Sequence, residues 1–360
     1  MAESIGREVR AACERAVHDA FGTAARIVAT TALAGDASSR RYVRLVLAGP
    51  GVPASAVAMV LGEGRFAPGS DELGGGIVID ELPFLNVGRW LAARGFPVPV
   101  IYHDAARRDG LLLLEDVGDT TLWAAAGAAP AAAAGLFARA VDLLATLQAE
   151  GARHPDPGCY AFRRRFDPRL ARRELEHFVE HGIETRRGRP LAPAARAALL
   201  DALAAVAAPF AAPDPVLVHR DFMAWNLHVQ DGRLRLLDFQ DALLGPDAYD
   251  LAALLTDRTT ATLIDPPLEA ELLARFTAAR AAAGLPLPGE VAARYRLCAL
   301  HRALKVIGRF HFLELVQGKP GYLAYLPAVY AVGRRMLAAL PALAGLQDRL
   351  AEHVPELAAA

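Results

Sequence analysis

The sequence predicts an α+β protein with two lobes, a small strand-rich lobe over residues 1–115 and a large helical lobe over residues 116–360. Apolar residues that alternate with polar ones, as in half-buried strands, occur mainly before residue 116. Beyond it, apolar residues recur mainly at helical spacing. A chain of 360 residues can bury a substantial core. We expect a cleft where the lobes meet, near Glu115.

The N-terminal lobe is expected to begin with an amphipathic helix within residues 1–22. Residues 40–48 alternate in polarity and predict a strand, and residues 56–61 predict a second one. The inward-facing positions of the first strand would be Val43, Leu45 and Leu47. Residues 62–76 are rich in Gly, Pro and charge, so we expect a loop there that could close as a lid.

A helix and a buried strand complete this lobe. The helix is indicated by apolar residues at helical spacing, which are Phe84, Val87 and Leu91. Gly95 would end it. The continuous apolar run at 111–114 is bounded by polar residues on both sides and predicts a buried strand.

The second lobe is predicted to be helical, with two short strands. A long helix is marked by Leu136, Ala140, Leu143, Leu144 and Leu147. Another covers residues 194–208, with Pro193 at its first position, where proline is tolerated. Strands are expected at 216–218 and 234–237, and the chain after Tyr249 reads as helical.

Composition excludes several classes of protein. Hydrophobic residues make up 54% and charged residues 22%, which rules out a disordered chain. With 39 Lys and Arg against 40 Asp and Glu, the chain lacks the positive charge on which nucleic-acid affinity rests. The three cysteines, Cys13, Cys159 and Cys298, are scattered, which fits a reducing compartment.

We expect a cytoplasmic protein that does not contact a membrane. The first 22 residues carry charges throughout, unlike a signal peptide. Residues 124–138 are uncharged, but they are mostly Ala and Gly, contain Pro130 and are too few to cross a bilayer. We interpret them as a loop followed by the start of a helix.

The residues that carry chemistry lie between 216 and 255. A predicted strand leads into a loop with Asp221, Asn226 follows five residues later, and a second strand leads to Asp238. Phosphoryl transfer from ATP uses a carboxylate to orient the acceptor hydroxyl, and an Asn and a second carboxylate to hold Mg²⁺. A lone Asp at a strand end is usually a turn or a cap. The combined pattern H-R-D-x-x-x-x-N with a later D-F is far more specific.

Two segments, HRDFMAWN and LDFQDALLGPDAYDLA, resemble the aminoglycoside phosphotransferase-like kinases, a branch of the protein-kinase fold that acts on small molecules. Within that branch, residues 35–45, 237–251 and 301–323 look like the bacterial anomeric kinases of N-acetylmuramate and N-acetylglucosamine. With residues 111–119, the similarity spans nearly the whole chain.

The resemblance implies roles for individual residues. Asp221 would be the catalytic base that contacts the acceptor, and Asn226 with Asp238 would bind Mg²⁺. Residues 35–41 would be the turn between the first two strands, with Ser38 and Ser39 offering backbone N–H groups and hydroxyls to the phosphates of ATP. On these residues alone, an ordinary hairpin turn is equally expected.

Three further residues have expected roles around this site. Glu115 would lie in a hinge whose backbone groups contact adenine. Asp250 would support the catalytic loop by accepting backbone N–H groups. Arg220 would pair with a buried carboxylate and so be structural.

The sequence departs from the protein kinases at one position. Their third strand carries a Lys that holds the phosphates, whereas the corresponding position here is Met59, and no lysine precedes Lys305. Either an arginine supplies the charge, or Mg²⁺ and backbone donors suffice, or the protein binds nucleotide without catalysis. The arginine candidates are Arg40, Arg41 and Arg44, of which we favour Arg41 or Arg44.

The charge of the C-terminal region bears on the acceptor. From residue 257 onward, twelve Arg and Lys face nine Asp and Glu, which suits a neutral or anionic acceptor better than a polycation. Arg302, Lys305 and Arg309 share one helix face. Lys305 is our candidate for a substrate or phosphate contact, and a solvated helix face is the alternative.

Together these observations predict an ATP- and Mg²⁺-dependent kinase that phosphorylates the C1 hydroxyl of N-acetylmuramate and N-acetylglucosamine in peptidoglycan recycling. The alternatives are an aminoglycoside, choline or homoserine kinase of the same branch, or a non-catalytic nucleotide-binding module.

Overall fold

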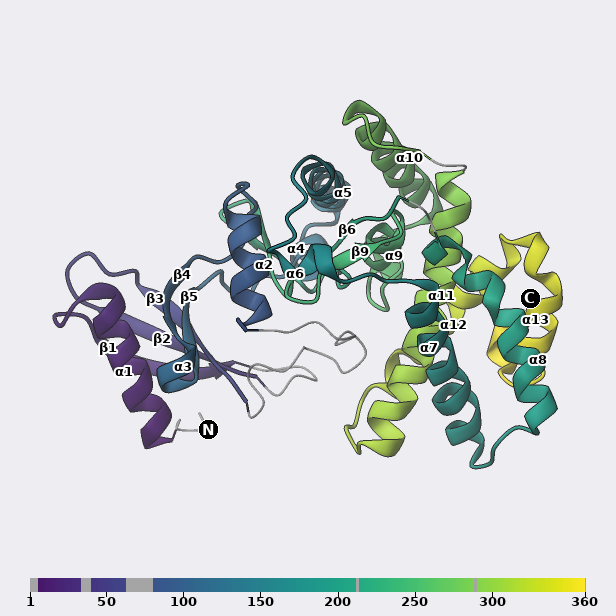
Figure 1. The fold of residues 1–360 in the computed structure, drawn as a ribbon, viewed down its shortest axis with the longest axis horizontal. Coiled ribbons are helices and arrows are strands. Elements are labelled where there is room, and N and C mark those ends of the chain that lie inside the picture. Colours follow the sequence, from purple (N-terminus) through teal and green to yellow (C-terminus); the bar gives the residue numbers. More distant parts are fainter. Residues whose placement is uncertain (1–5, 34–39, 63–79, 212–213, 288–289, 360) are drawn as a thin grey trace. The chain divides into compact units, whose positions relative to one another are not determined.

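A computed structural model describes residues 6–33, 40–62, 80–211, 214–287 and 290–359 (Figure 1). The chain forms two compact units. The N-terminal unit comprises Met1–Thr120 and His228–Leu237, and the C-terminal unit comprises Thr121–Leu227 and Asp238–Ala360. The lobe boundary placed after Glu115 from the sequence stays a prediction.

The N-terminal unit is built on an antiparallel sheet of five strands with the order β1-β2-β3-β5-β4. The strands are β1 (Arg26–Leu33), β2 (Arg41–Ala48), β3 (Ser55–Val60), β4 (Ile101–Ala105) and β5 (Leu111–Glu115). The predicted strands at 40–48, 56–61 and 111–114 are confirmed. The residue pattern indicated neither β1 nor β4, and only the resemblance implied a strand before residue 35. A separate hairpin is formed by β7 (Leu227–Gln230) and β8 (Arg233–Leu236).

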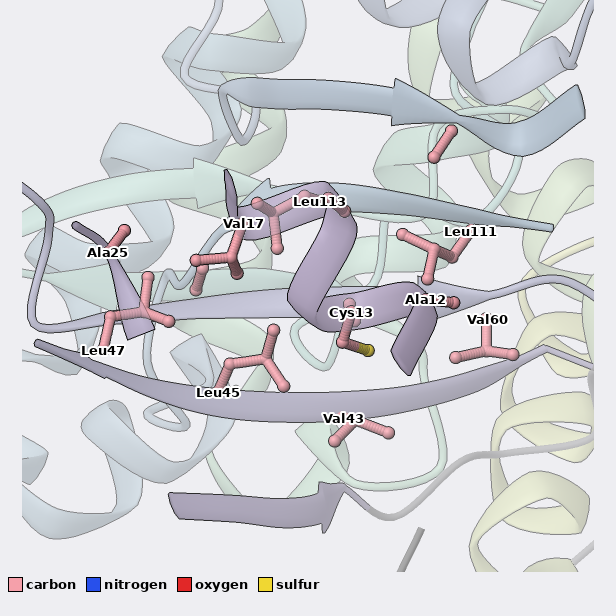
Figure 2. Packing of buried hydrophobic residues seen from close by; sticks show 14 residues of the cluster. Ala12, Cys13, Val17, Ala25, Val43, Leu45, Leu47, Val60, Leu111 and Leu113 are labelled. Carbon is pink, nitrogen blue, oxygen red and sulfur yellow. The ribbon is translucent and has the colours of Figure 1, made fainter. Parts of the chain in front are cut away.

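Helix α1 (Arg7–Phe21) packs on one face of this sheet (Figure 2). Its Cys13 and Val17 meet the inward-facing residues of β2 and β5. The alternation predicted for β2 is confirmed, since the exposed fractions of Val43, Leu45 and Leu47 are 4%, 0% and 6%. This cluster is part of the hydrophobic core of the N-terminal unit.

Two helices complete the N-terminal unit, α2 (Pro83–Ala92) and the single turn α3 (Ala106–Asp109). Helix α2 confirms the predicted helix, and it begins with a proline in its first turn. Gly95 follows it with φ of 74°, a left-handed conformation that glycine adopts readily. The expected loop at 62–76 lies almost wholly outside the described residues.

The C-terminal unit is mainly helical, with one small two-stranded sheet. Its helices are α4 (Leu122–Ala128), α5 (Pro130–Arg153), α6 (Tyr160–Arg163), α7 (Pro168–His177), α8 (Pro193–Leu203), α9 (Tyr249–Leu255), α10 (Pro266–Ala282), α11 (Val291–His311), α12 (Leu326–Ala338) and α13 (Ala344–Ala351). The strands β6 (Val216–Val218) and β9 (Leu243–Gly245) pair antiparallel. Helix α11 packs against α7, α9 and α12 and forms the centre of the unit (Figure 1).

The loop expected at the start of residues 124–138 is wrong, because α4 occupies Leu122–Ala128. The hydroxyl of Thr121 caps this helix by accepting the N–H of Ala124 at 3.1 Å.

By length and composition, Pro130–Arg153 and Pro193–Ala211 could each cross a membrane, and a bent helix pair could add a third span. Within the C-terminal unit, however, α5 packs against α4, α10 and β6.

All three cysteines are buried, with exposed fractions of 0% for Cys13, 2% for Cys159 and 0% for Cys298. Burial raises the pKa of the Cys13 thiol to about 11 and also raises that of Cys298. These thiols therefore behave as small apolar core residues.

Helix α11 approaches the backbone at the end of α7 closely at Gly308. A Cβ atom at this position would lie 2.6 Å from the Cα of Phe178 and 3.0 Å from the carbonyl oxygen of His177. We expect Gly308→Ala to destabilise the protein by about 1–3 kcal/mol, because both obstructing atoms belong to the backbone. Urea denaturation measures this change.

Gly135 is the matched control, since it lies in α5 and a Cβ there would meet nothing within 4 Å. Gly135→Ala should raise stability by about 0.5–1 kcal/mol through helix propensity. Equal effects of the two substitutions would contradict the close approach at Gly308.

Candidate active site

The loop after β6 and the segment after β8 bring together the three residues predicted to carry the chemistry. The side-chain nitrogen of Asn226 donates a hydrogen bond to the backbone carbonyl of Asp221 at 2.8 Å. The same nitrogen lies 3.4 Å from a carboxylate oxygen of Asp238. All three residues belong to the C-terminal unit. The sequence pattern thus corresponds to one cluster in space.

This donor set fits Mg²⁺. Because Asn226 uses its amide nitrogen toward Asp221, its amide oxygen remains for a cation, and Asp238 supplies a carboxylate. Gln240 donates a 2.8 Å hydrogen bond to Asp238 and so helps to orient that carboxylate. Among the described residues, no group of three or more His, Cys, Asp or Glu side chains could hold a metal ion. A Mg²⁺ ion here would therefore need waters and substrate phosphates as its other ligands.

Two residues at this site have an unusual backbone conformation. Arg220, directly before the expected base, has φ of 78°, and Asp238 has φ of 61°. The left-handed region costs a non-glycine residue about 1–3 kcal/mol and persists only where surrounding contacts enforce it.

Three elements fix Arg220 through its N–H, its carbonyl and its side chain. Asp250 on α9 accepts the N–H groups of His219 at 2.6 Å and of Arg220 at 2.9 Å. The guanidinium of Arg302 on α11 donates to the carbonyl of Arg220 at 3.2 Å. The guanidinium of Arg220 donates to Glu174 on α7 at 3.1 Å. The supporting roles predicted for Asp250 and Arg220 are confirmed.

Glu174 is a central residue that sequence analysis missed. Its side chain is 3% exposed and lies 2.7 Å from the ammonium of Lys305 and 3.1 Å from Arg220. Burial acts to raise the pKa of Glu174, but these two cations outweigh it and lower the pKa to about 2. One pattern in the sequence could have indicated it, because Glu174 shares the buried face of α7 with Leu170 and Leu175, where an acidic residue needs a partner.

The cations of α11 do not form a uniformly solvated face. Arg302 is 7% exposed, and its guanidinium lies 5.0 Å from the ring of Tyr249. Lys305 is ion-paired, and Arg309 is exposed. The solvated-face alternative is therefore wrong for Arg302 and Lys305. A contact between Lys305 and substrate stays a prediction.

Glu115 ends β5 and is fixed within the N-terminal unit. Its carboxylate accepts hydrogen bonds from Arg235 on β8 at 2.8 Å and from the N–H of Val100 at 3.0 Å. Its own N–H donates to the carbonyl of Val100 at 2.8 Å. An adenine ring would thus have to meet other backbone groups of this segment, and that contact stays a prediction.

Met59 is fully buried on β3, so its position offers no cation for phosphate. Arg44 on β2 makes two hydrogen bonds to Asp116, at 2.7 and 3.0 Å, and two to Asp119, at 2.7 and 2.8 Å. Its charge is therefore already matched by carboxylates. Arg41 is exposed at the start of β2, and among the described residues it has no ion pair. Ser38 and Ser39 lie outside the described residues.

The chain is similar to known phosphotransferases and amino-sugar kinases. The model of the family described as "Phosphotransferase enzyme family" matches residues 78–293. The N-acetylmuramate/N-acetylglucosamine kinase of Pseudomonas putida is 33% identical over 326 residues, which cover 89% of this chain and 87% of that protein. The kinase of the same name from Pseudomonas aeruginosa is 33% identical over 278 residues, 75% of this chain and 77% of that protein.

A solved structure supports the same fold. The GDP complex of an aminoglycoside 2′-phosphotransferase-IIIa variant aligns with a TM-score of 0.59 at 14% identity, covering 92% of this chain and 98% of that one. At this identity the match concerns the fold alone. The predicted bilobal, protein-kinase-like fold is confirmed.

Glu174 is expected to be essential for stability. Glu174→Gln should lower the free energy of unfolding by about 3–5 kcal/mol near pH 7, because it leaves Arg220 and Lys305 without their buried counter-charge. The folded pKa of about 2 lies below the ordinary value of 4.5, so the contribution is complete above pH 4.5 and is lost as pH falls toward 2. The deficit of the variant should shrink over that range.

Glu176 is the matched control on the same helix, since its side chain is 40% exposed and, among the described residues, pairs only with Arg172 at 3.0 Å. Glu176→Gln should change stability by less than about 0.5 kcal/mol at any of these pH values. A deficit of Glu174→Gln that stays constant with pH would refute the ion-pair explanation.

Proposed function

Because this chain belongs to the phosphotransferase enzyme family, we propose that it transfers the γ-phosphoryl group of ATP to the C1 hydroxyl of N-acetylmuramate and of N-acetylglucosamine. The products are sugar 1-phosphates that enter peptidoglycan recycling in the cytoplasm. The juxtaposition of Asp221, Asn226 and Asp238 carries the reaction type. The acceptor follows from the two relatives named for these sugars.

Each residue of the cluster has a distinct task. Asp221 accepts the proton of the sugar hydroxyl. The oxygen of that hydroxyl forms the new bond to the γ-phosphorus, and the bond between the γ-phosphorus and the leaving ADP oxygen breaks. The clamped backbone of Arg220 keeps the carboxylate of Asp221 in place. Asn226 and Asp238 hold Mg²⁺, which when bound neutralises charge on the phosphates.

ATP is bound by residues other than the cluster of Asp221, Asn226 and Asp238. We assign the phosphate-binding cation to Arg41, because Arg44 is already paired with Asp116 and Asp119. Ser38 and Ser39 contribute hydroxyls and N–H groups to the phosphates, and the segment after Glu115 meets adenine through its backbone. A contact between Lys305 and the acceptor stays a prediction, because its ammonium is already paired with Glu174 at 2.7 Å.

Two other functions are weaker candidates. A cationic acceptor, such as an aminoglycoside or choline, fits poorly with the excess of Arg and Lys after residue 257. A non-catalytic nucleotide-binding module is suggested only by Met59 at the lysine position, and the intact cluster of Asp221, Asn226 and Asp238 weighs against it.

The reaction is tested by ³¹P NMR with ATP, Mg²⁺ and either sugar, with kanamycin in a parallel sample. We expect a sugar 1-phosphate signal coupled to the anomeric proton. Asp221→Asn should lower kcat by about 10²–10⁴-fold with little change in ATP affinity, because the proton acceptor is lost.

Asp231→Asn provides the matched control for this substitution. Asp231 is exposed in the β7–β8 turn with φ of 49°, a conformation that Asn also tolerates. Its variant should retain full activity. Near-normal turnover by Asp221→Asn would remove this residue as the base, and phosphorylated kanamycin alone would reassign the acceptor.

The phosphate-binding cation is tested by separate substitution of two arginines. Arg41→Ala should raise the KM for ATP roughly tenfold, the effect of losing about 1.4 kcal/mol of phosphate contact. Arg44→Ala should instead lower the thermal midpoint, because Asp116 and Asp119 lose their shared partner. Steady-state kinetics and thermal unfolding distinguish the two. If neither variant changes the KM for ATP, Mg²⁺ and backbone donors suffice.

A further inference from the structure

A guanidinium lies between aromatic rings just after α9. The central guanidinium carbon of Arg258 is 4.7 Å from the ring centroid of Tyr325 and 5.3 Å from that of Phe310. The centroids of these two rings are 6.1 Å apart. The Nε atom of Arg258 is buried without a hydrogen-bond partner, and among the described residues this guanidinium has no ion pair with a carboxylate.

The segment that carries Arg258 is tied to the catalytic loop. The indole N–H of Trp225, the residue before Asn226, donates to the hydroxyl of Thr259 at 2.8 Å. That hydroxyl donates in turn to Asp257 at 2.8 Å, so the neighbouring carboxylate is directed to Thr259. Trp225 also stacks on Trp123, with ring centroids 4.7 Å apart. All these residues lie in the C-terminal unit, so Arg258 is held in a fixed relation to the metal-binding Asn226.

Two cations of α11 near the catalytic loop are already engaged. Lys305 is paired with Glu174 at 2.7 Å, and Arg302 donates to the carbonyl of Arg220. Arg309 is exposed, with its guanidinium 5.5 Å from the ring of Phe312. Arg258 therefore combines partial burial, a fixed orientation and an unmatched charge.

These properties suit a carboxylate ligand. A guanidinium forms two parallel hydrogen bonds with a carboxylate, and partial removal from water strengthens them. Stacking on aromatic rings restricts the guanidinium, so less entropy is lost when a ligand binds. N-acetylmuramate carries a lactyl carboxylate, whereas N-acetylglucosamine does not.

We propose that Arg258 is a specificity-determining residue that binds the lactyl carboxylate of N-acetylmuramate. This inference rests on the proposed function, because it concerns one of the two sugar acceptors. Phe310 and Tyr325 hold the guanidinium, and Thr259 fixes its distance from the catalytic loop. N-acetylglucosamine uses the same site without this contact.

The test compares kcat/KM for both sugars in the full-length wild-type chain and in Arg258→Met. Met keeps an apolar side chain between the two rings and removes the charge. We expect kcat/KM for N-acetylmuramate to fall about 10- to 100-fold, the range for loss of a charged hydrogen-bonded contact, and that for N-acetylglucosamine to stay within about twofold. Arg309→Met is the matched control and should leave both values unchanged.

A chemical probe completes the experiment. N-acetylmuramate with its lactyl carboxylate converted to the amide should be a poor substrate for the wild type, and Arg258→Met should no longer distinguish acid from amide. Arg258→Lys keeps the charge without the bidentate geometry, so it should retain part of the discrimination. If Arg258→Met does not fold, Arg258→Lys and the amide still test the assignment.

The outcomes distinguish the assignment of Arg258 from the proposed function. Equal losses for both sugars would make Arg258 structural, and no loss for either would place the carboxylate elsewhere; both results overturn the assignment and leave the proposed function intact. A wild-type chain that phosphorylates neither sugar overturns the proposed function and the assignment together.

Discussion

The loop that carries Asp221, the proposed base, depends on one costly backbone conformation, the left-handed geometry of Arg220. No turn glycine provides it, so neighbouring helices must enforce it. Asp250 fixes the N–H, Arg302 the carbonyl and Glu174 the side chain. Because α7, α9 and α11 each supply one contact, the packing of the C-terminal unit determines where Asp221 lies. The position of Asp221, the proposed base, is therefore a property of the whole helical unit and not of the loop alone.

The two carboxylates that enforce this geometry show how partners decide the effect of burial. Burial raises the pKa of Asp250 to about 7, since its partners are mainly the N–H groups of His219 and Arg220. Glu174 is as deeply buried, yet its pKa falls to about 2 because Lys305 and Arg220 carry full positive charges. The N–H dipoles at Asp250 only partly offset the loss of hydration, so its pKa rises. The two cations at Glu174 more than offset that loss, so its pKa falls.

Local patterns in the sequence predicted the features that depend on local structure. The alternation in β2, the apolar run of β5 and the spacing of Asp221, Asn226 and Asp238 needed no knowledge of distant contacts. The residue pattern did not indicate strand β1 because none of its positions is fully buried and its apolar residues do not alternate regularly with polar ones. Helix α4 was missed because Ala and Gly give little periodicity. The partnership of Glu174 with Lys305 joins helices far apart in the chain, which no local pattern encodes.

The burial of all three cysteines has a practical consequence for spectroscopy. A thiol-selective fluorophore or spin label meets no accessible native thiol, since Cys13, Cys159 and Cys298 are each at most 2% exposed. One cysteine introduced at an exposed position of each unit, such as Asp231 and Arg309, would thus give a doubly labelled protein without prior removal of native residues. The distance between such labels would report whether the separation of the two units changes during turnover.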